Sequence, residues 1–150
     1  MSKEQSLQPG TVARAFNRAF GFLVAQGLAP AYCHELSVVG RKSGKVYTTP
    51  VNLLNYEGKL WLVGARGHMQ WTRNAEAAGE VVLRRGKKRT TYTIRITALA
   101  ERAPVLKRYL DTWPGQVQSF FSVRAGAPVD EFTAVVDQHP VYELISKPVQ

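Results

Sequence analysis

The sequence predicts a single α+β domain that is mainly β, with about six antiparallel strands curled into a sheet or small barrel and flanked by helices. Three observations support this fold class. The chain has 150 residues, the length of one ordinary domain, so residues 1–150 are expected to form it. Short runs rich in β-branched residues follow one another through turn sequences typical of hairpins. The regular strand–helix–strand alternation of a doubly wound fold is missing.

The first part of the chain is predicted to contain one helix followed by strands. Apolar residues at helical spacing predict an amphipathic helix over residues 11–27, after a flexible segment at residues 1–10. Beyond Glu35 the apolar residues follow the period of a strand. The Glu-Gly pair at residues 57–58 supplies the turn of a hairpin. The strands expected here are residues 36–39, 46–56 and 59–65.

The second part is predicted to alternate helices with strands. Gly79 ends a short helix, and Pro104 is expected in the first turn of the next helix, where proline is tolerated. The β-branched run after Lys88 supports a long strand, which the turn at residues 85–87 joins to its predecessor. In chain order, the elements are a helix at 70–78, strands at 80–84 and 88–99, a helix at 103–113, a partly helical segment at 115–137 and a strand at 141–145.

The charge of the chain is strongly positive. Lys and Arg number 20 against 11 Asp and Glu, which gives a net charge of +9. Such a field favours an anionic partner, which could be nucleic acid, anionic lipid or a small molecule rich in phosphate or carboxylate groups. The single cysteine, Cys33, excludes an internal disulfide, and the polar N-terminus lacks the apolar core of a signal peptide. No apolar run approaches the roughly 18 residues of a membrane span, so a cytoplasmic location is expected.

The strongest candidate for ligand binding is the run Gly-Arg-Lys-Ser-Gly-Lys at residues 40–45, between two predicted strands. Its glycines let backbone N–H groups approach an oxyanion, and its cations add charge-assisted hydrogen bonds. The glycine spacing and the strand that follows exclude a P-loop. A solvated hairpin turn is the other interpretation. The second basic run, Arg-Arg-Gly-Lys-Lys-Arg at residues 84–89, is either a charged turn or a surface for a polyanion.

Two further segments could contribute to a site. Residues 64–69 follow a strand, and their small side chains would let a flat ring lie against the backbone, unless they form an ordinary exposed loop. Trp71 and Asn74 share a helix face and either support a pocket or form a core tryptophan with a capping asparagine. Adjacent strand residues point to opposite faces, which argues against Cys33 and His34 as a nucleophile–base pair. No metal-ligand spacing or catalytic motif occurs, so an enzyme of this sequence needs a cofactor to supply the chemistry.

The order of these motifs resembles the deazaflavin-dependent nitroreductase family, whose members are split β-barrels of the FMN-binding type that use coenzyme F420. The resemblance rests on Leu-Ser-Val-Val-Gly-Arg-Lys-Ser-Gly-Lys-Val-Tyr-Thr-Thr-Pro-Val at residues 36–51, then a hairpin, a Gly/Ala loop and Trp-x-x-Asn-x-x-Ala at residues 71–77. It extends over residues 11–145 and implies a set of cofactor-binding residues. The phosphate and glutamyl tail of the coenzyme would be held by Arg41, Lys42, Ser43, Gly44 and Lys45. The wall beside the deazaflavin would be formed by Thr49, Pro50 and Val51, and the residues approaching the ring would be Ala65, Arg66 and Gly67. The pocket would be supported by Trp71 and Asn74.

The chain departs from the family pattern in ways that bear on the substrate. The loop before Trp71 is shorter than usual, and Tyr47 stands where many members have Arg. Tyrosines shape the substrate pocket in nitroreductase members, but this chain has Phe120 and Phe121 in that region, which cannot donate a hydrogen bond. Tyr109 is the candidate proton donor.

The leading hypothesis is a reductase that passes hydride from reduced deazaflavin to an electron-poor small organic acceptor, with no metal and no specific nucleic acid. An FMN-dependent oxidoreductase is the first alternative, because a phosphate anchor would also hold the ribityl phosphate of FMN. A non-catalytic carrier of a fatty acid or tetrapyrrole is the second, and its aromatic residues would be Phe16, Phe20, Trp113, Phe120 and Phe121. Nucleic-acid binding is disfavoured because an aromatic-basic stripe is missing. A homodimer and peripheral membrane contact stay open.

Overall fold

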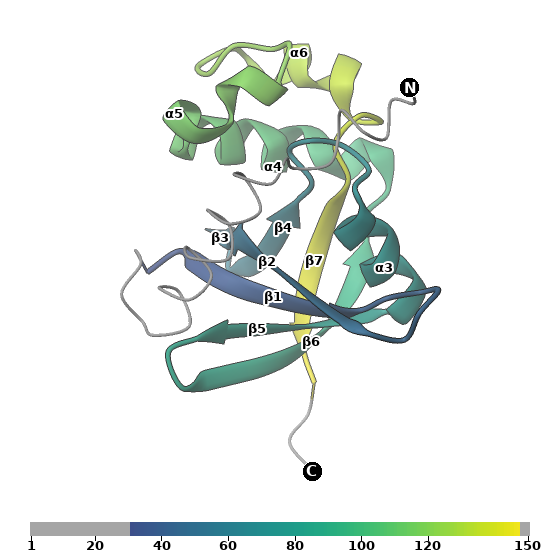
Figure 1. Cartoon of the computed structure of the whole chain (residues 1–150). Coiled ribbons are helices and arrows are strands. Elements are labelled where there is room, and N and C mark those ends of the chain that lie inside the picture. The colour runs from purple at the N-terminus through teal and green to yellow at the C-terminus, as the bar shows by residue number, and fades with distance from the viewer. Residues whose placement is uncertain (1–30, 148–150) are drawn as a thin grey trace.

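The computed structural model describes residues 31–147 (Figure 1). The expected helix at residues 11–27 and the flexible segment at residues 1–10 lie outside the described residues. Within residues 31–147, seven strands form one antiparallel sheet, in the order β2-β1-β5-β6-β7-β4-β3. Their bounds are β1 Cys33–Val39, β2 Val46–Asn52, β3 Leu54–Tyr56, β4 Lys59–Val63, β5 Glu80–Arg85, β6 Lys88–Ile96 and β7 Val141–Ser146.

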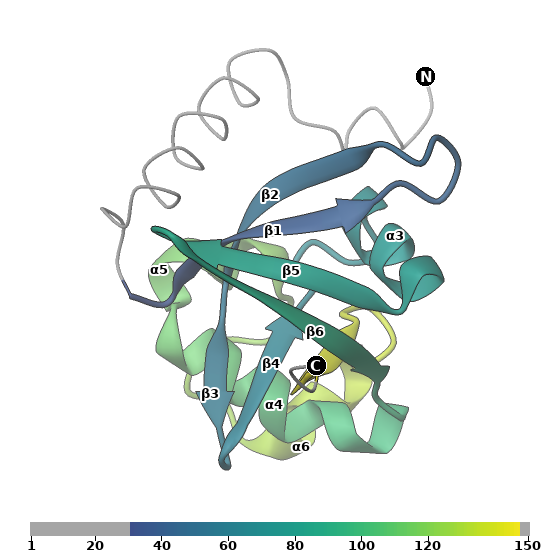
Figure 2. The ribbon, with the colours of Figure 1, turned by 90° about the horizontal axis from the view of Figure 1, so that it is seen from below.

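The sheet is curled because its two edge strands are consecutive in the chain. β2 pairs with β1 and β3 pairs with β4, yet only Leu53 separates them. The N–H of Leu53 bonds to the carbonyl of Tyr32 at 2.8 Å rather than to a ladder partner. The single strand expected over residues 46–56 is therefore wrong, and its division brings the number of strands to seven (Figure 2). The predicted fold class, a curled antiparallel sheet with flanking helices, is confirmed.

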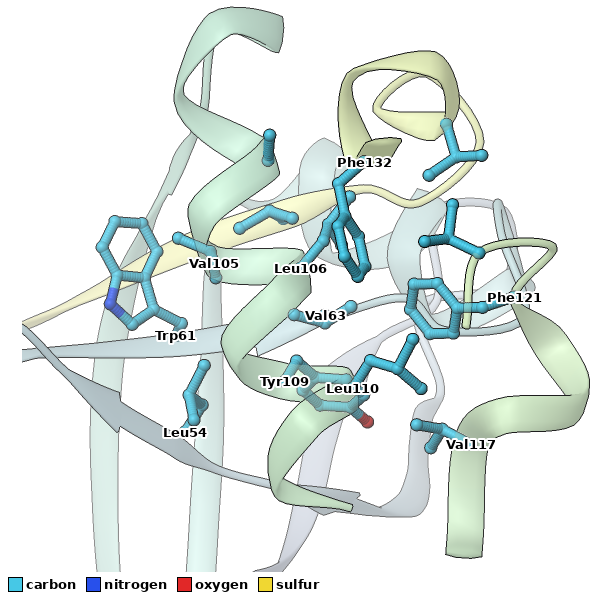
Figure 3. Close-up of a cluster of buried hydrophobic side chains, with 14 of the residues drawn as sticks. Leu54, Trp61, Val63, Val105, Leu106, Tyr109, Leu110, Val117, Phe121 and Phe132 are labelled. Atoms are coloured by element: carbon cyan, nitrogen blue, oxygen red, sulfur yellow. The ribbon is translucent and has the colours of Figure 1, made fainter. Parts of the chain in front are cut away.

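Two apolar clusters stabilise the molecule. One fills the interior of the barrel, and it comprises Leu36, Val38, Leu62, Ala75, Val81, Leu83, Ile94, Tyr142 and Leu144. The other lies between the outer face of β3, β4 and β7 and the C-terminal helices. Figure 3 shows Trp61 and Leu54 on the strands facing Val105 and Tyr109 on a helix. Alternation along β4 explains both clusters, because Leu62 points inward while Trp61 and Val63 point outward.

The helices close the barrel on two sides. The first, α3 (Gln70–Ala78), packs against β1 and β5 and ends at Gly79, whose φ of 77° is the left-handed conformation expected of a helix-ending glycine. On the other side lie α4 (Leu99–Thr112), α5 (Pro114–Val117) and α6 (Val129–Phe132), which gather at one end of the barrel in Figure 1. Short 3-10 turns follow at η1 (Gln118–Phe120) and η2 (Thr133–Val135). No helix among residues 31–147 is long and apolar enough to cross a membrane.

The start of α4 differs from the prediction. The helix begins at Leu99 rather than residue 103, and β6 ends at Ile96 rather than residue 99. The cause is a cap, because the carboxylate of Glu101 accepts the N–H of Ala98 at 2.9 Å and supplies a partner for an otherwise free donor. Pro104 consequently lies inside the helix, beyond the first turn in which it was expected.

Candidate functional site

A pocket of about 790 Å³ opens beside β2, a volume within the range of small-molecule and cofactor sites. Its walls come from the β1–β2 loop, β2, the segment after β4, the first half of α3 and the region from α4 to η1. Segments far apart in the sequence therefore meet at one cavity. Most of the residues that the sequence singled out line it, namely Arg41, Lys42, Ser43, Thr49, Pro50, Val51, Ala65, Arg66, Trp71, Asn74 and Tyr109.

The remaining expected residues, Gly44, Lys45 and Gly67, shape the walls without lining the pocket. Gly44 and Gly67 have φ values of 74° and 93°, which a residue with a side chain rarely adopts. The carbonyl of Lys45 accepts the N–H of Gly40 at 2.7 Å and closes the base of the loop. These three residues set the backbone path of the loops that carry their neighbours.

Tyr47 closes the basic loop from one side. Its ring lies so near Gly40 that a Cβ on Gly40 would be 2.5 Å from Cε2 of the ring. Its hydroxyl and Oγ of Ser43 are 3.2 Å apart, and Oγ of Ser43 also accepts the N–H of Lys45 at 3.1 Å. Tyr47 therefore contributes packing and a hydrogen bond to the loop, and no charge.

Arg41 is bound to helix α3. Its guanidinium Nη1 donates to Oε1 of Gln70 at 3.0 Å and to Oδ1 of Asn74 at 2.8 Å, and its backbone N–H donates to the same Oδ1 at 3.1 Å. Asn74 is buried in the middle of α3, so its side chain acts on the loop and not as a helix cap. Both acceptors are neutral, which leaves the positive charge of Arg41 uncompensated.

The segment after β4 is held in one conformation. Gly64 donates to the carbonyl of Pro140 at 2.8 Å, and Gly67 donates to the carbonyl of Gly64 at 2.9 Å. A Cβ on Gly64 would lie 2.8 Å from Cγ of Pro140, so the backbone here approaches the residue before β7 more closely than a side chain would allow. This turn presents Arg66, whose guanidinium carbon lies 4.8 Å from the centre of the Phe120 ring.

In contrast to the cationic walls of the pocket, one wall is aromatic and apolar. It contains Tyr109, Val117 and Phe120. Tyr109 is 5% exposed, packs edge-on against Trp113 with ring centres 5.1 Å apart, and burial raises its pKa to about 12. Figure 3 shows its hydroxyl oxygen in red, and this hydroxyl forms no hydrogen bond within residues 31–147. Phe121 lies in the core instead, stacked on His139 at 4.1 Å, so only the first of the two phenylalanines faces the pocket.

Several lining residues were not anticipated from the sequence. Gln70 and Arg73 share the helix with Asn74. Helical spacing could have indicated Gln70, four residues before Asn74, and then Arg73, three residues after Gln70. Gln116 had no such signal, because the segment around it gave no clear pattern. It accepts from Nδ2 of Asn52 at 2.9 Å and donates to the hydroxyl of Tyr32 at 3.0 Å, which connects β2 to the start of α5.

The charges of the pocket are of one sign. Among the described residues, its lining includes the cations Arg41, Lys42, Arg66 and Arg73 and contains no Asp or Glu. The second basic run of the sequence lies elsewhere, in β5 and β6 and the turn between them, where Arg84 pairs with Glu35 at 3.1 Å. Cationic walls without a carboxylate favour an anionic ligand or an anionic product.

Other chemistry can be limited. Within the described residues, no cluster of His, Cys, Asp and Glu could hold a metal ion. Cys33 is buried in β1, where desolvation raises the pKa of its thiol, while the ring of the half-buried His34 lies 3.3 Å from the carbonyl of Tyr32. These two side chains do not form a nucleophile–base pair.

Comparisons with known proteins agree with this architecture. A family model described as F420H(2)-dependent quinone reductase matches residues 13–129. Among solved structures, an F420-H2 dependent reductase (FDR-A) is 21% identical, with a TM-score of 0.52 over 76% of this chain and 94% of that one. A domain-swapped dimer is 20% identical, with a TM-score of 0.54 over 89% and 96%. A FAD-binding protein from Mesorhizobium loti is 10% identical, with a TM-score of 0.52 over 87% and 89%. No curated protein is significantly similar to the chain.

Proposed function

The chain belongs to the F420H(2)-dependent quinone reductase family, and on this premise we propose that it transfers hydride from reduced coenzyme F420 to a quinone or a similar flat, electron-poor acceptor. Family membership makes it an oxidoreductase with coenzyme F420 as its cofactor, as the sequence resemblance implied. The observation that carries the proposed reaction is the pocket beside β2, which combines uncompensated cations with an aromatic wall.

The residues of the pocket fit this cofactor. Its phosphate and glutamyl tail are anionic, and Arg41, Lys42 and Arg73 face the cavity without an ion pair to any Asp or Glu of residues 31–147. Its ring is flat and largely apolar, and Pro50 and Val51 give it a partly buried wall. The donors and the apolar surface that the cofactor needs are therefore both in one cavity.

We assign the phosphate and the tail to Arg41, Lys42 and Ser43, on a loop whose path Gly44 and Lys45 determine. Thr49, Pro50 and Val51 of β2 and Ala65 after β4 bound the space for the ring, with Gly67 turning the latter segment. Trp71 lines the floor from α3, and Asn74 holds Arg41 in place. When bound, reduced coenzyme F420 supplies the hydride from C5 of its deazaflavin.

The protein's contribution to the reaction is orientation and control of protons. The apolar wall formed by the buried Tyr109 and Val117 and the more exposed Phe120 shields one side of the acceptor from water. The hydroxyl of Tyr109 keeps its proton at neutral pH, and burial, which raises its pKa to about 12, makes it a weaker acid than an ordinary tyrosine. We therefore assign Tyr109 the role of a hydrogen-bond donor to the acceptor, while water delivers the proton that completes the reduction.

The proposal is tested first by binding. Purified protein is titrated with oxidised coenzyme F420 and, in parallel, with FMN, following fluorescence at low and moderate salt. Tight binding of F420 with little affinity for FMN, and oxidation of reduced F420 by menadione in the presence of the protein, are the expected results. Preference for FMN would favour the FMN-dependent alternative, and binding of neither with a copurifying lipid or pigment would favour the carrier.

A double variant tests the assigned anchor. Arg41→Ala with Lys42→Ala removes two charge-assisted contacts, and each is worth enough for the F420 affinity to fall by about tenfold or more. The matched control is Lys87→Ala with Lys88→Ala, which removes the same charge beside the β5–β6 turn, outside the pocket. If the two double variants bound F420 with equal affinity, the assignment of the phosphate and tail to the basic loop would be wrong.

A further inference from the structure

Arg66 is separated from the other cations of the pocket. Arg41 and Lys42 lie on the β1–β2 loop and Arg73 lies on α3, which contacts that loop through Asn74. Arg66 comes from the turn after β4, and its guanidinium lies over Phe120 of the aromatic wall. The pocket therefore has one cationic group at the loop and α3, and a single cation at the wall assigned to the acceptor.

The backbone turn that carries the exposed Arg66 side chain is held in place by its neighbours. The turn is bonded to Pro140 through Gly64, and no side chain larger than hydrogen fits at Gly64 without a shift of Pro140. The contact with the Phe120 ring orients the guanidinium from the other side. No Asp or Glu among residues 31–147 pairs with Arg66, so its hydrogen-bond donors are available to a ligand.

We propose that Arg66, which the resemblance placed beside the deazaflavin ring, instead binds the acceptor at a carbonyl oxygen and stabilises the negative charge that develops there as the hydride arrives. The inference rests on the proposed function. In the step, the acceptor gains a hydrogen nucleus with two electrons, the cofactor loses them, and the acceptor becomes a hydroquinone monoanion. A proton from water then completes the hydroquinone. A guanidinium aimed at the oxygen that becomes negative stabilises the transition state more than the neutral substrate.

The chemistry predicts a preference for anionic quinones that can be measured without turnover. The probes are 2-hydroxy-1,4-naphthoquinone, which is ionised at neutral pH, and 1,4-naphthoquinone, which has the same rings and no charge. Both are titrated by calorimetry into protein saturated with oxidised F420, and into protein alone. We expect the wild type to bind the anion more tightly, and Arg66→Met to reduce the ratio of the two affinities by about tenfold.

Two variants make the test specific. Arg108 lies 4.8 Å from the ring of Tyr56, the same distance as Arg66 from Phe120, but outside the pocket. Arg108→Met therefore removes the same charge and the same kind of contact, and we expect it to leave the anion preference unchanged. Arg66→Lys keeps the charge without the planar fork and should retain part of the preference.

The outcomes separate this inference from the function on which it rests. If wild-type protein binds no F420, the proposed function fails, and the naphthoquinone pair measured on protein alone still reports on Arg66. If F420 binds but Arg66→Met keeps the full anion preference, the role of Arg66 is overturned. The same conclusion follows if Arg66→Met weakens F420 binding and leaves the naphthoquinone ratio intact, because Arg66 would then serve the cofactor.

Discussion

Arg41 donates two hydrogen bonds to one oxygen of Asn74, from its backbone N–H at 3.1 Å and from its guanidinium at 2.8 Å. Asn74 is 5% exposed, so this acceptor belongs to the buried face of α3. A neutral amide holds the β1–β2 loop to the helix and leaves the charge of Arg41 available to an anion. The pair explains how a loop rich in cations is ordered without an acidic partner.

Asn74→Asp tests this explanation. The carboxylate has nearly the same shape and accepts the same hydrogen bonds, but it neutralises Arg41. We expect the affinity for oxidised F420 to fall by about tenfold while the free energy of unfolding in urea is kept or increased. Asn74→Ala is the matched control, and it should lower both quantities because the loop loses its attachment. An Asn74→Asp variant that binds F420 as tightly as wild type would contradict the role of the uncompensated charge.

Gly40→Ala tests the packing of Tyr47 on the loop. The new methyl group would lie 2.5 Å from Cε2 of Tyr47, so the ring must move and lose its contact with Ser43. We expect a destabilisation of about 1–3 kcal/mol, the usual cost of overpacking, in urea unfolding.

The control for this prediction is a double-mutant cycle. In a Tyr47→Ala background, the methyl group at residue 40 meets no ring, so Gly40→Ala should cost much less there than in the wild type. Equal costs in the two backgrounds would show that the requirement for Gly40 does not come from Tyr47.

The sequence predicted the local turns and helix faces of the site better than the long-range contacts that bring its walls together. Gly44 and Gly79 announce their turns because few other residues adopt a positive φ, and helical spacing places Trp71 and Asn74 on one face. The interruption between β2 and β3 at Leu53 has no comparable signal in the sequence, because the residues around it continue a strand pattern. The break is determined by the pairing of β2 and β3 with different strands. The place of Gln116 in the pocket could not be predicted for the same reason, because its contacts with Asn52 and Tyr32 form only in the tertiary fold.

The start of α4 was missed because its signal is a side-chain cap. Glu101 is an ordinary acidic residue in the sequence, and its value appears only when its carboxylate reaches the N–H of Ala98 and the guanidinium of Arg95 at 2.8 Å. The acceptor side of the pocket is harder still to predict from the sequence. The guanidinium carbon of Arg66 lies 4.8 Å from the centre of the Phe120 ring, but the two residues come from segments far apart in the chain.

Arg102 is expected to be the most important buried cation for stability. It is 8% exposed, and it donates to Oγ1 of Thr97 at 3.0 Å, to the carbonyl of Thr97 at 3.1 Å and to that of Val136 at 2.9 Å. Arg102→Met leaves these acceptors without their donor, and we expect a loss of about 3 kcal/mol in urea unfolding. Lys147→Met, which breaks an exposed pair with Glu80, should change stability by less than about 0.5 kcal/mol. Similar values for the two variants would contradict a structural role of the buried guanidinium.

The burial of His139 leads us to expect a loss of stability in mild acid. It is 3% exposed, stacks on Phe121, and both ring nitrogens lack a hydrogen-bond partner in the described part of the chain. Burial lowers its pKa below the usual 6.5, and the backbone of Gly64 and Ala65, which lies near the ring without hydrogen-bond geometry, offsets part of this shift. The unfolded chain thus binds a proton at a pH at which the folded protein does not, so the free energy of unfolding should fall as the pH drops below 6.5.

The measurement is urea unfolding at a series of pH values through this range, for the wild type and for His139→Leu. The variant has no proton to bind, so its free energy of unfolding should fall less steeply on acidification, although it starts lower in neutral solution because the stacked ring is lost. His34, whose pKa burial also lowers, contributes to the slope that remains, and Glu101 and Asp111, whose pKa values are lowered, add to it at more acidic pH. His34→Gln provides the matched comparison, since it keeps His139 and should retain that residue's share of the slope. If His139→Leu and the wild type have the same slope, His139 does not titrate between the folded and unfolded states and its buried neutral form contributes nothing to the pH dependence.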